Sequence, residues 1–174
     1  MVHGPDTTRT LAWLRAGVTL RLLEELPKAD VLSTAPGRRS VQIRTPGGPA
    51  LHITIRDGHV RFHDRPRPFP GVTLFFPRPE HLTATLSGGS APVVPLPTSP
   101  RFVAAINAFR GLTARLRERF ADPELRPRLL LLATLYGVEV VANRDPYVAA
   151  RVARIPDGTI AVRVEGDDRV RGWL

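Results

Sequence analysis

Hydrophobic positions near the N-terminus repeat at helical spacing. Between Leu11 and Leu22 an apolar residue recurs every three or four positions, after a candidate N-cap at Asp6 or Thr7. Apolar residues with this period form one face of an α-helix. Pro27 is expected to end the helix, because proline disfavours the helical conformation in the residue before it.

Alternating apolar and polar residues then predict four strands, at residues 40–45, 51–56, 59–63 and 72–76. Asp57-Gly58 separates the second strand from the third and is a strong signal for a two-residue hairpin loop. With this loop Ile53 faces Phe62 and His52 faces His63, so that one face of the hairpin is apolar and the other polar. The fourth strand is apolar on both sides, which indicates that both of its faces are covered.

Helical patterns dominate the second half of the chain. A short helix is expected from Pro79 to Gly88, and residues 91–100, which hold four prolines, should be extended or irregular. Ser99 is the expected cap of a long helix with an apolar stripe from Phe102 to Phe120. The remaining predicted elements are an apolar helix at about 128–143, a short helix through Arg154 and a last strand, Thr159–Glu165, which could extend the sheet.

This order of elements predicts an α+β protein. A length of 174 residues suits a single domain with a full hydrophobic core, so we expect one domain over 1–174. Residues 1–6 should be flexible, and residues 100–154 should form a helical elaboration. The absence of cysteine excludes disulfides, thiol nucleophiles and thiolate metal sites.

The net charge of +9 raises the question of nucleic-acid binding. Of the 25 basic residues only Lys28 is a lysine, and the arginines are spread along the chain without a known nucleic-acid-binding motif. Recognition of phosphate backbones needs basic residues gathered on one face. We therefore expect most arginines to point to solvent and nucleic acid to be an improbable partner.

The polar residues suggest no catalytic or metal site. His52 and His63 are expected to be cross-strand neighbours, but no carboxylate is placed to complete a metal site, and solvated surface histidines are the simpler interpretation. The acidic pair Glu24-Glu25 points in divergent directions, as neighbours in sequence do. No nucleophile-elbow, Walker or dinucleotide-binding motif is present. The sequence therefore predicts a protein that is not an enzyme and that uses no cofactor.

The apolar runs are too short for a membrane span. The longest, Leu129–Val138, is about half the roughly 20 residues that a bilayer crossing needs. The N-terminus lacks the profile of a signal peptide. We expect no transmembrane segment and a cytoplasmic location.

Several consecutive motifs together resemble the sterol carrier protein type 2 (sterol-binding) domain family. They are the strand GRRSVQIRT, the turn PGGPA, the hairpin LHITIRDGHVRF and the strand–helix segment GVTLFFPRPEHLTATLSGGSAP. The C-terminal segment LLLLATLYGVEVVANRDPYVAARVARIPDGTIAVRVE is similar to uncharacterised bacterial members. After about residue 92 the sequence departs from the family, because VVPLPTSP and a long helix replace the next strand.

The resemblance implies a twisted, mainly antiparallel five-stranded sheet covered by helices, with an apolar tunnel between the two layers. It places Leu74, Phe76, Leu82 and Leu86 at the border of that tunnel. The apolar stripe of the long helix supplies more apolar surface than a small sheet needs, and such surface can line a ligand cavity. The candidate lining residues are Leu74, Phe76, Leu82, Leu86, Phe102, Ile106 and Phe109.

Three functions remain open at this point. The first is non-catalytic binding or carriage of a fatty-acyl or sterol-like lipid in a cavity between sheet and helices. The second is a closed-core interaction module without a ligand, for which a homodimer is one form. The third is binding of an anion or nucleic acid through arginine.

Overall fold

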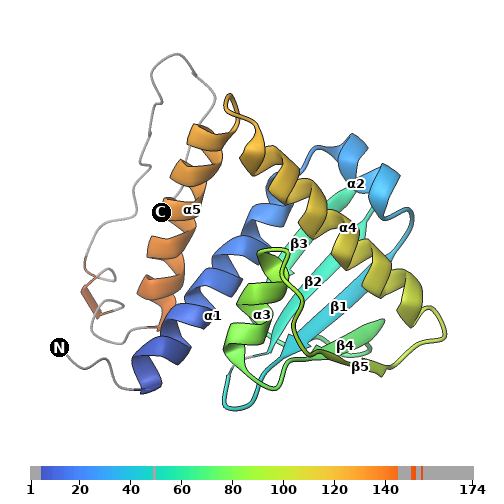
Figure 1. The fold of residues 1–174 in the computed structure, drawn as a ribbon, viewed down its shortest axis with the longest axis horizontal. Coiled ribbons are helices and arrows are strands. Elements are labelled where there is room, and N and C mark those ends of the chain that lie inside the picture. The colour runs from blue at the N-terminus through green and yellow to red at the C-terminus, as the bar shows by residue number, and fades with distance from the viewer. Residues whose placement is uncertain (1–4, 49, 145–149, 152–153, 155–174) are drawn as a thin grey trace. The chain divides into compact units, whose positions relative to one another are not determined.

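The structure is a computed structural model that describes residues 5–48, 50–144, 150–151 and 154 (Figure 1). The described residues form two compact units, which divide after Glu118. The first unit contains the sheet and most of the helices. The predicted last strand, Thr159–Glu165, and most of the short helix predicted before it lie outside the described residues.

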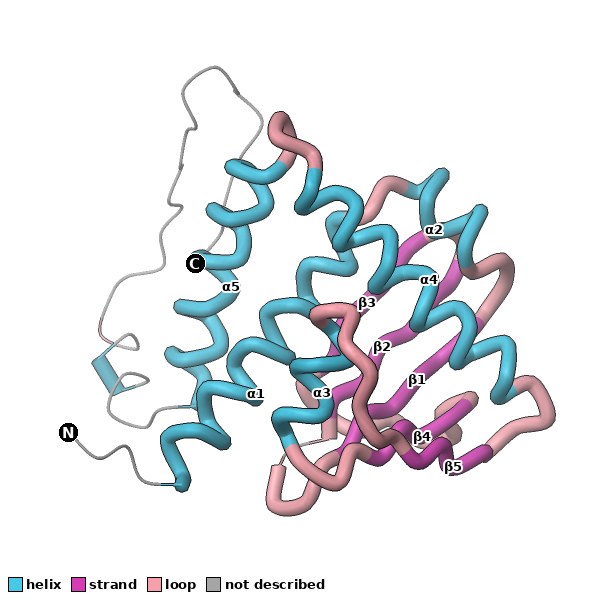
Figure 2. The backbone as a smooth tube through the Cα atoms, viewed as in Figure 1, coloured by secondary structure: helices cyan, strands magenta, loops and turns pink. Residues whose placement is uncertain are grey.

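The first unit is an α+β arrangement, as predicted. Its helices are α1 (Pro5–Leu22), the 3-10 turn η1 (Leu23–Glu25), α2 (Lys28–Thr34), α3 (Pro79–Leu86) and α4 (Phe102–Ala121), the last of which runs past the unit boundary. Its strands are β1 (Arg39–Arg44), β2 (Leu51–Arg56), β3 (His59–His63), β4 (Val72–Phe75) and β5 (Val94–Pro97). Figure 2 shows the strands as one sheet.

The sheet is mixed, and the expectation of a mainly antiparallel sheet needs this correction. Its strand order is β3-β2-β1-β4-β5, and β1 pairs in parallel with β4, whereas the other neighbours are antiparallel. The parallel pair arises because the chain does not turn back beside β3. Instead it crosses to the far side of β1 before it forms β4.

The hairpin of β2 and β3 has the predicted register. Ile53 pairs with Phe62 and His52 with His63. The φ angles of Asp57 and Gly58 are 54° and 78°, the left-handed pair that a type I′ turn requires. The prediction from Asp57-Gly58 and the alternating runs is therefore confirmed.

The segment 64–71 crosses the polar face of the sheet. The segment leaves β3 after His63, which is level with Gln42 of β1. It must pass β2 and β1 to begin β4 at Val72. Three strand spacings of about 4.8 Å make this a span of about 14 Å. The amide of Gly71 donates to both the carbonyl and the hydroxyl of Ser40 at 3.0 and 2.9 Å, on the next strand. This crossing explains why Gln42 and His52 are buried although they lie on the polar face.

The edge strand β5 lies in the proline-rich segment for which the sequence predicted only an extended or irregular course. Leu96 pairs with Thr73, and Pro95 and Pro97 occupy the alternate positions. Proline is tolerated in a strand where the missing N–H would face solvent. The prolines therefore remove outward donors from this edge, which hinders pairing with another chain.

The apolar face of the sheet lies beneath α1, α3 and α4 (Figure 1). Val41, Ile43 and Ile53 on this face are completely buried. Close packing also depends on glycine: a Cβ on Gly111 of α4 would lie 2.2 Å from Cγ2 of Thr34 at the end of α2. The core therefore occupies the space between the sheet and these helices.

In the second unit, α5 spans Arg126–Arg144, close to the predicted limits of 128–143. Leu129 and Leu132 of this helix are buried. Among the described residues, no helix has the length and apolar character needed to cross a bilayer.

Candidate functional site

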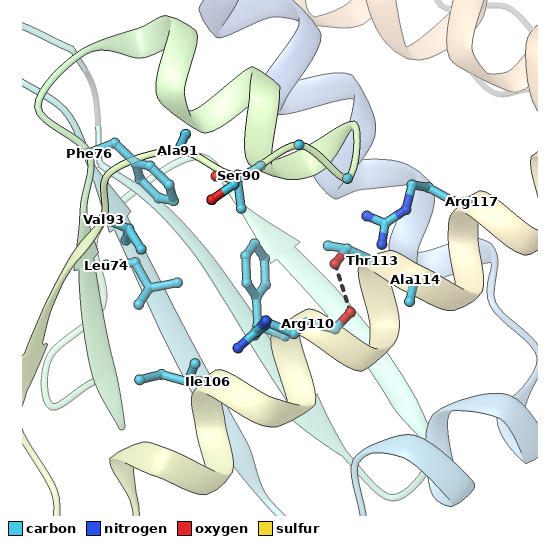
Figure 3. Close-up of a pocket in the computed structure, with 14 residues that line it drawn as sticks. Leu74, Phe76, Ser90, Ala91, Val93, Ile106, Arg110, Thr113, Ala114 and Arg117 are labelled. Atoms are coloured by element: carbon cyan, nitrogen blue, oxygen red, sulfur yellow. Dashed lines mark hydrogen bonds between the residues drawn. The ribbon is translucent and has the colours of Figure 1, made fainter.

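An apolar cleft of about 510 Å³ lies between β4, the segment that follows α3, and α4. Figure 3 shows Leu74 and Val93 on the sheet side, opposite Ile106 and Arg110 on α4. We call this hollow the α4 cleft. Its lining residues are Leu74, Phe76, Thr85, Gly88, Gly89, Ser90, Ala91, Val93, Ile106, Phe109, Arg110, Thr113, Ala114 and Arg117.

Four of the seven candidate lining residues meet at the α4 cleft: Leu74, Phe76, Ile106 and Phe109. Sequence spacing explains this arrangement. Leu74 in β4 and Phe76 directly after it are two positions apart and therefore point to the same side of the sheet. Ile106 and Phe109 are three positions apart and therefore lie on one face of α4.

The other three candidates do not line the α4 cleft. Leu82 and Leu86 are buried in the core on α3, a helix that packs against α1. Phe102 is half-buried in the first turn of α4.

Two arginines of α4 give one side of the α4 cleft a polar rim. Arg110 is exposed, and Thr113 donates a hydrogen bond from its hydroxyl to the carbonyl of Arg110 at 2.9 Å (Figure 3). Arg117 donates from Nη1 to the carbonyl of Leu86 at 3.3 Å. The cleft thus combines an apolar interior with guanidinium groups, an arrangement that suits an amphipathic anion.

The segment 88–93 forms one side of the α4 cleft, and the sequence did not predict this. Gly88 has a φ of 92°, and a Cβ there would lie 3.1 Å from Nε of Arg117. A turn at Gly88 therefore brings the following segment beside α4. The Gly88-Gly89 pair signalled the end of α3, but helix periodicity carries no information about where the chain goes next.

The two paired histidines differ from the prediction of solvated surface residues. His52 is only 1% exposed, and its ring centroid lies 5.9 Å from that of His63. Burial lowers the pKa of His52 to about 4, with smaller contributions from His63 and Arg67. The prediction was wrong for His52 because it did not foresee that segment 64–71 covers the polar face.

His63 is half-buried, and burial followed by the charges of Arg67 and Arg61 lowers its pKa. In the part of the chain that the structure describes, no group of three or more histidine, aspartate or glutamate side chains could hold a metal ion.

No protein-family model matches the sequence, and a search of curated proteins found no significant match.

Proposed function

We propose that this protein binds an apolar or amphipathic small molecule, such as a fatty-acyl or sterol-like lipid, in the α4 cleft and does not transform it. The observation that carries the proposal is the α4 cleft itself. Four of the seven lining residues that the sequence predicted lie together around one hollow of about 510 Å³. Small-molecule sites commonly enclose about 300–1,000 Å³ and are mostly apolar with a few polar groups. The resemblance to the sterol carrier family supports the same ligand class.

The affinity expected from this site is modest. If a bound hydrocarbon chain loses roughly 300 Å² of exposed surface, the hydrophobic contribution at about 25 cal/mol per Å² is about 7.5 kcal/mol. The loss of ligand freedom reduces that figure, so dissociation constants in the micromolar range or above are expected. Ligand selection would depend mainly on chain length and on the acidic headgroup, because Arg110 and Arg117 supply the charged groups in the lining.

On this proposal the protein is a cytoplasmic lipid carrier or sensor. Neither a cofactor nor a catalytic group is part of the proposal.

The test uses full-length protein purified without detergent. Native mass spectrometry should reveal co-purified lipid, and palmitate should displace a fluorescent fatty acid in a saturable manner. If the protein carries no co-purified lipid and shows no saturable displacement, the proposal is overturned and the closed-core interaction module is favoured.

Two tryptophan substitutions on the same helix locate the binding site. Ala114→Trp places a large ring in the α4 cleft and should weaken fatty-acid binding about tenfold or more. Val103→Trp is the matched control, because Val103 is 54% exposed and lies outside the cleft lining. Equal affinities in the two variants would place the ligand elsewhere.

A third variant examines the headgroup. Arg110→Gln removes an exposed guanidinium at the cleft, so it should weaken palmitate binding about two- to fivefold. Binding of the uncharged alcohol of the same chain length should not change. An equal loss for both molecules would show that Arg110 does not contact the headgroup.

A further inference from the structure

A second hollow, of about 990 Å³, lies along the β2–β3 hairpin and is strongly basic. We call it the hairpin cleft. It contains none of the residues that line the α4 cleft. Its lining residues are Arg21, Glu24, Arg38, Thr54, Ile55, Arg56, Asp57, His59, Val60, Arg61, Phe62, His63 and Arg67.

Strand geometry gathers these charges from distant parts of the sequence. Arg61 and His63 alternate along β3 and therefore share a face, and Arg61 pairs with Thr54 of β2. Arg67 comes from the segment that crosses this same face and donates from Nη2 to Nδ1 of His63 at 3.3 Å. The arginines that look scattered in the sequence are therefore neighbours here.

Carboxylates neutralise only part of the charge. Glu24 pairs with Arg21, and Asp57 pairs with Arg56 at 3.0 Å. Among the residues that the structure describes, Arg38, Arg61 and Arg67 form no ion pair. The lining thus has five guanidiniums and two carboxylates, an excess of three positive charges.

A chain of polar contacts holds Arg67 in position without neutralising it. Because Arg67 donates to Nδ1 of His63, that nitrogen must carry the lone pair, and the ring proton belongs on Nε2. Nε2 lies 3.2 Å from Oγ1 of Thr54, which can accept that proton. A carboxylate partner would cancel the charge of Arg67, whereas a neutral imidazole leaves it available to a ligand.

We propose that the hairpin cleft binds a phosphate or diphosphate group of a small molecule. Planar guanidiniums donate paired N–H groups to phosphate oxygens, and an excess of three positive charges matches a multiply charged anion better than a single carboxylate. The alternative of a merely solubilising surface is less consistent with the cleft, since such surfaces intersperse both signs of charge. On α4, for example, Arg115 pairs with Glu118 at 2.8 Å.

A nucleic-acid strand fits the lining less well than a small anion. Single-strand binding commonly uses aromatic side chains on which bases stack. Apart from its histidines, the hairpin cleft has one aromatic residue in its lining, the half-buried Phe62.

The test measures binding of inorganic pyrophosphate to the full chain by calorimetry at low salt. Arg61→Gln/Arg67→Gln should weaken binding tenfold or more, because each substitution removes charge-assisted hydrogen bonds to the phosphate oxygens. The control, Arg101→Gln/Arg128→Gln, changes the net charge equally outside the hairpin cleft and should weaken binding less than about twofold. Equal losses in the two double variants, or no binding to the wild type, would overturn the proposal.

A second readout reports the position of the bound anion. Burial and the positive charges of Arg67 and Arg61 lower the pKa of His63, and His52 and Asp64 also lie near its ring. A phosphate bound beside the two arginines would oppose their positive potential. Pyrophosphate should therefore raise the pKa of His63 in an NMR titration. An unchanged His63 in the presence of saturating pyrophosphate would contradict the site.

Two further arms identify the source of the phosphate. Binding to vesicles that contain phosphatidic acid, in competition with pyrophosphate, would identify a lipid headgroup. Pyrophosphate binding without vesicle binding would identify a soluble phosphorylated molecule. If a single-stranded oligonucleotide binds while pyrophosphate does not, the small-anion proposal is wrong.

Discussion

Replacing His52 with glutamine should remove a large part of the acid sensitivity of the fold. The His52 side chain is 1% exposed, and its Nδ1 has no hydrogen-bond partner among the described protein groups. Its pKa falls from an ordinary value of 6.5 to about 4, chiefly because burial penalises the charged ring. Protonation of His52 is therefore much more favourable in the unfolded chain than in the folded one.

The direction and size of the effect follow from proton linkage. Below about pH 6.5 the unfolded state binds a proton that the folded state does not bind until about pH 4, so the free energy of unfolding falls as the pH falls through this window. The loss should be about 1 kcal/mol near pH 5.5 and about 3 kcal/mol near pH 4, relative to pH 7.

The measurement is urea denaturation at about pH 7, 5.5 and 4, followed by circular dichroism. The free energy of unfolding of wild type should fall relative to that of His52→Gln by the amounts given above. Other titrating groups are common to both proteins and largely cancel in the difference. His59→Gln is the control, because His59 is an exposed histidine of the same hairpin, and it should follow wild type. Parallel pH profiles for wild type and His52→Gln would refute the reasoning.

Three further sets of substitutions address the packing, the hairpin turn and a side-chain hydrogen bond of the first unit, and each is measured by urea denaturation. Gly111→Ala should destabilise by about 1–3 kcal/mol, because its Cβ would lie 2.2 Å from Cγ2 of Thr34, and a simultaneous Thr34→Ala change should recover most of the loss. Gly58→Ala should cost about 1–2 kcal/mol, since the φ of 78° disfavours a side chain; no loss would contradict the type I′ turn. In the wild type the backbone amide of Phe62 donates a hydrogen bond to Oε1 of Glu24 at 2.5 Å. Glu24→Gln should change stability by less than about 1 kcal/mol, because the glutamine side-chain oxygen can still accept this hydrogen bond. Glu24→Ala removes that acceptor and should cost about 1–3 kcal/mol; equal values for the two Glu24 variants would show that the bond is unimportant.

Local patterns in the sequence predict the elements of the first unit well. The hairpin register was predictable because its apolar face must be buried along its whole length, and a slip of one residue would reverse the faces. Asp57-Gly58 then allows a turn of only two residues. The short helix α3 was likewise predictable, since Pro79 and Gly88 bound its apolar residues.

The path of the chain between elements was not predictable in the same way. Nothing in segment 64–71 indicates that it passes over two strands, yet this crossing buries His52 and makes β4 parallel to β1. β5 was missed for a related reason. Prolines exclude a central strand, but they are compatible with an edge, and only the tertiary arrangement shows that an edge was available there.

The two clefts illustrate why binding sites are harder to predict than strands. A strand is specified by which residues must be buried, whereas a cleft depends on volume that the neighbouring side chains leave unfilled. Leu74 and Leu82 look alike in the sequence, and both are buried, but only Leu74 borders the α4 cleft.

The hairpin cleft shows the same limit for charge. Arg38, Arg61 and Arg67 come from the approach to β1, from β3 and from the segment that crosses the sheet, so no local window of sequence contains the cluster. The hairpin that buries Ile53 on one face presents Arg61 on the other. Strand alternation therefore accounts both for the hydrophobic core and for part of the basic cleft, while the crossing segment supplies Arg67 and its contact with His63.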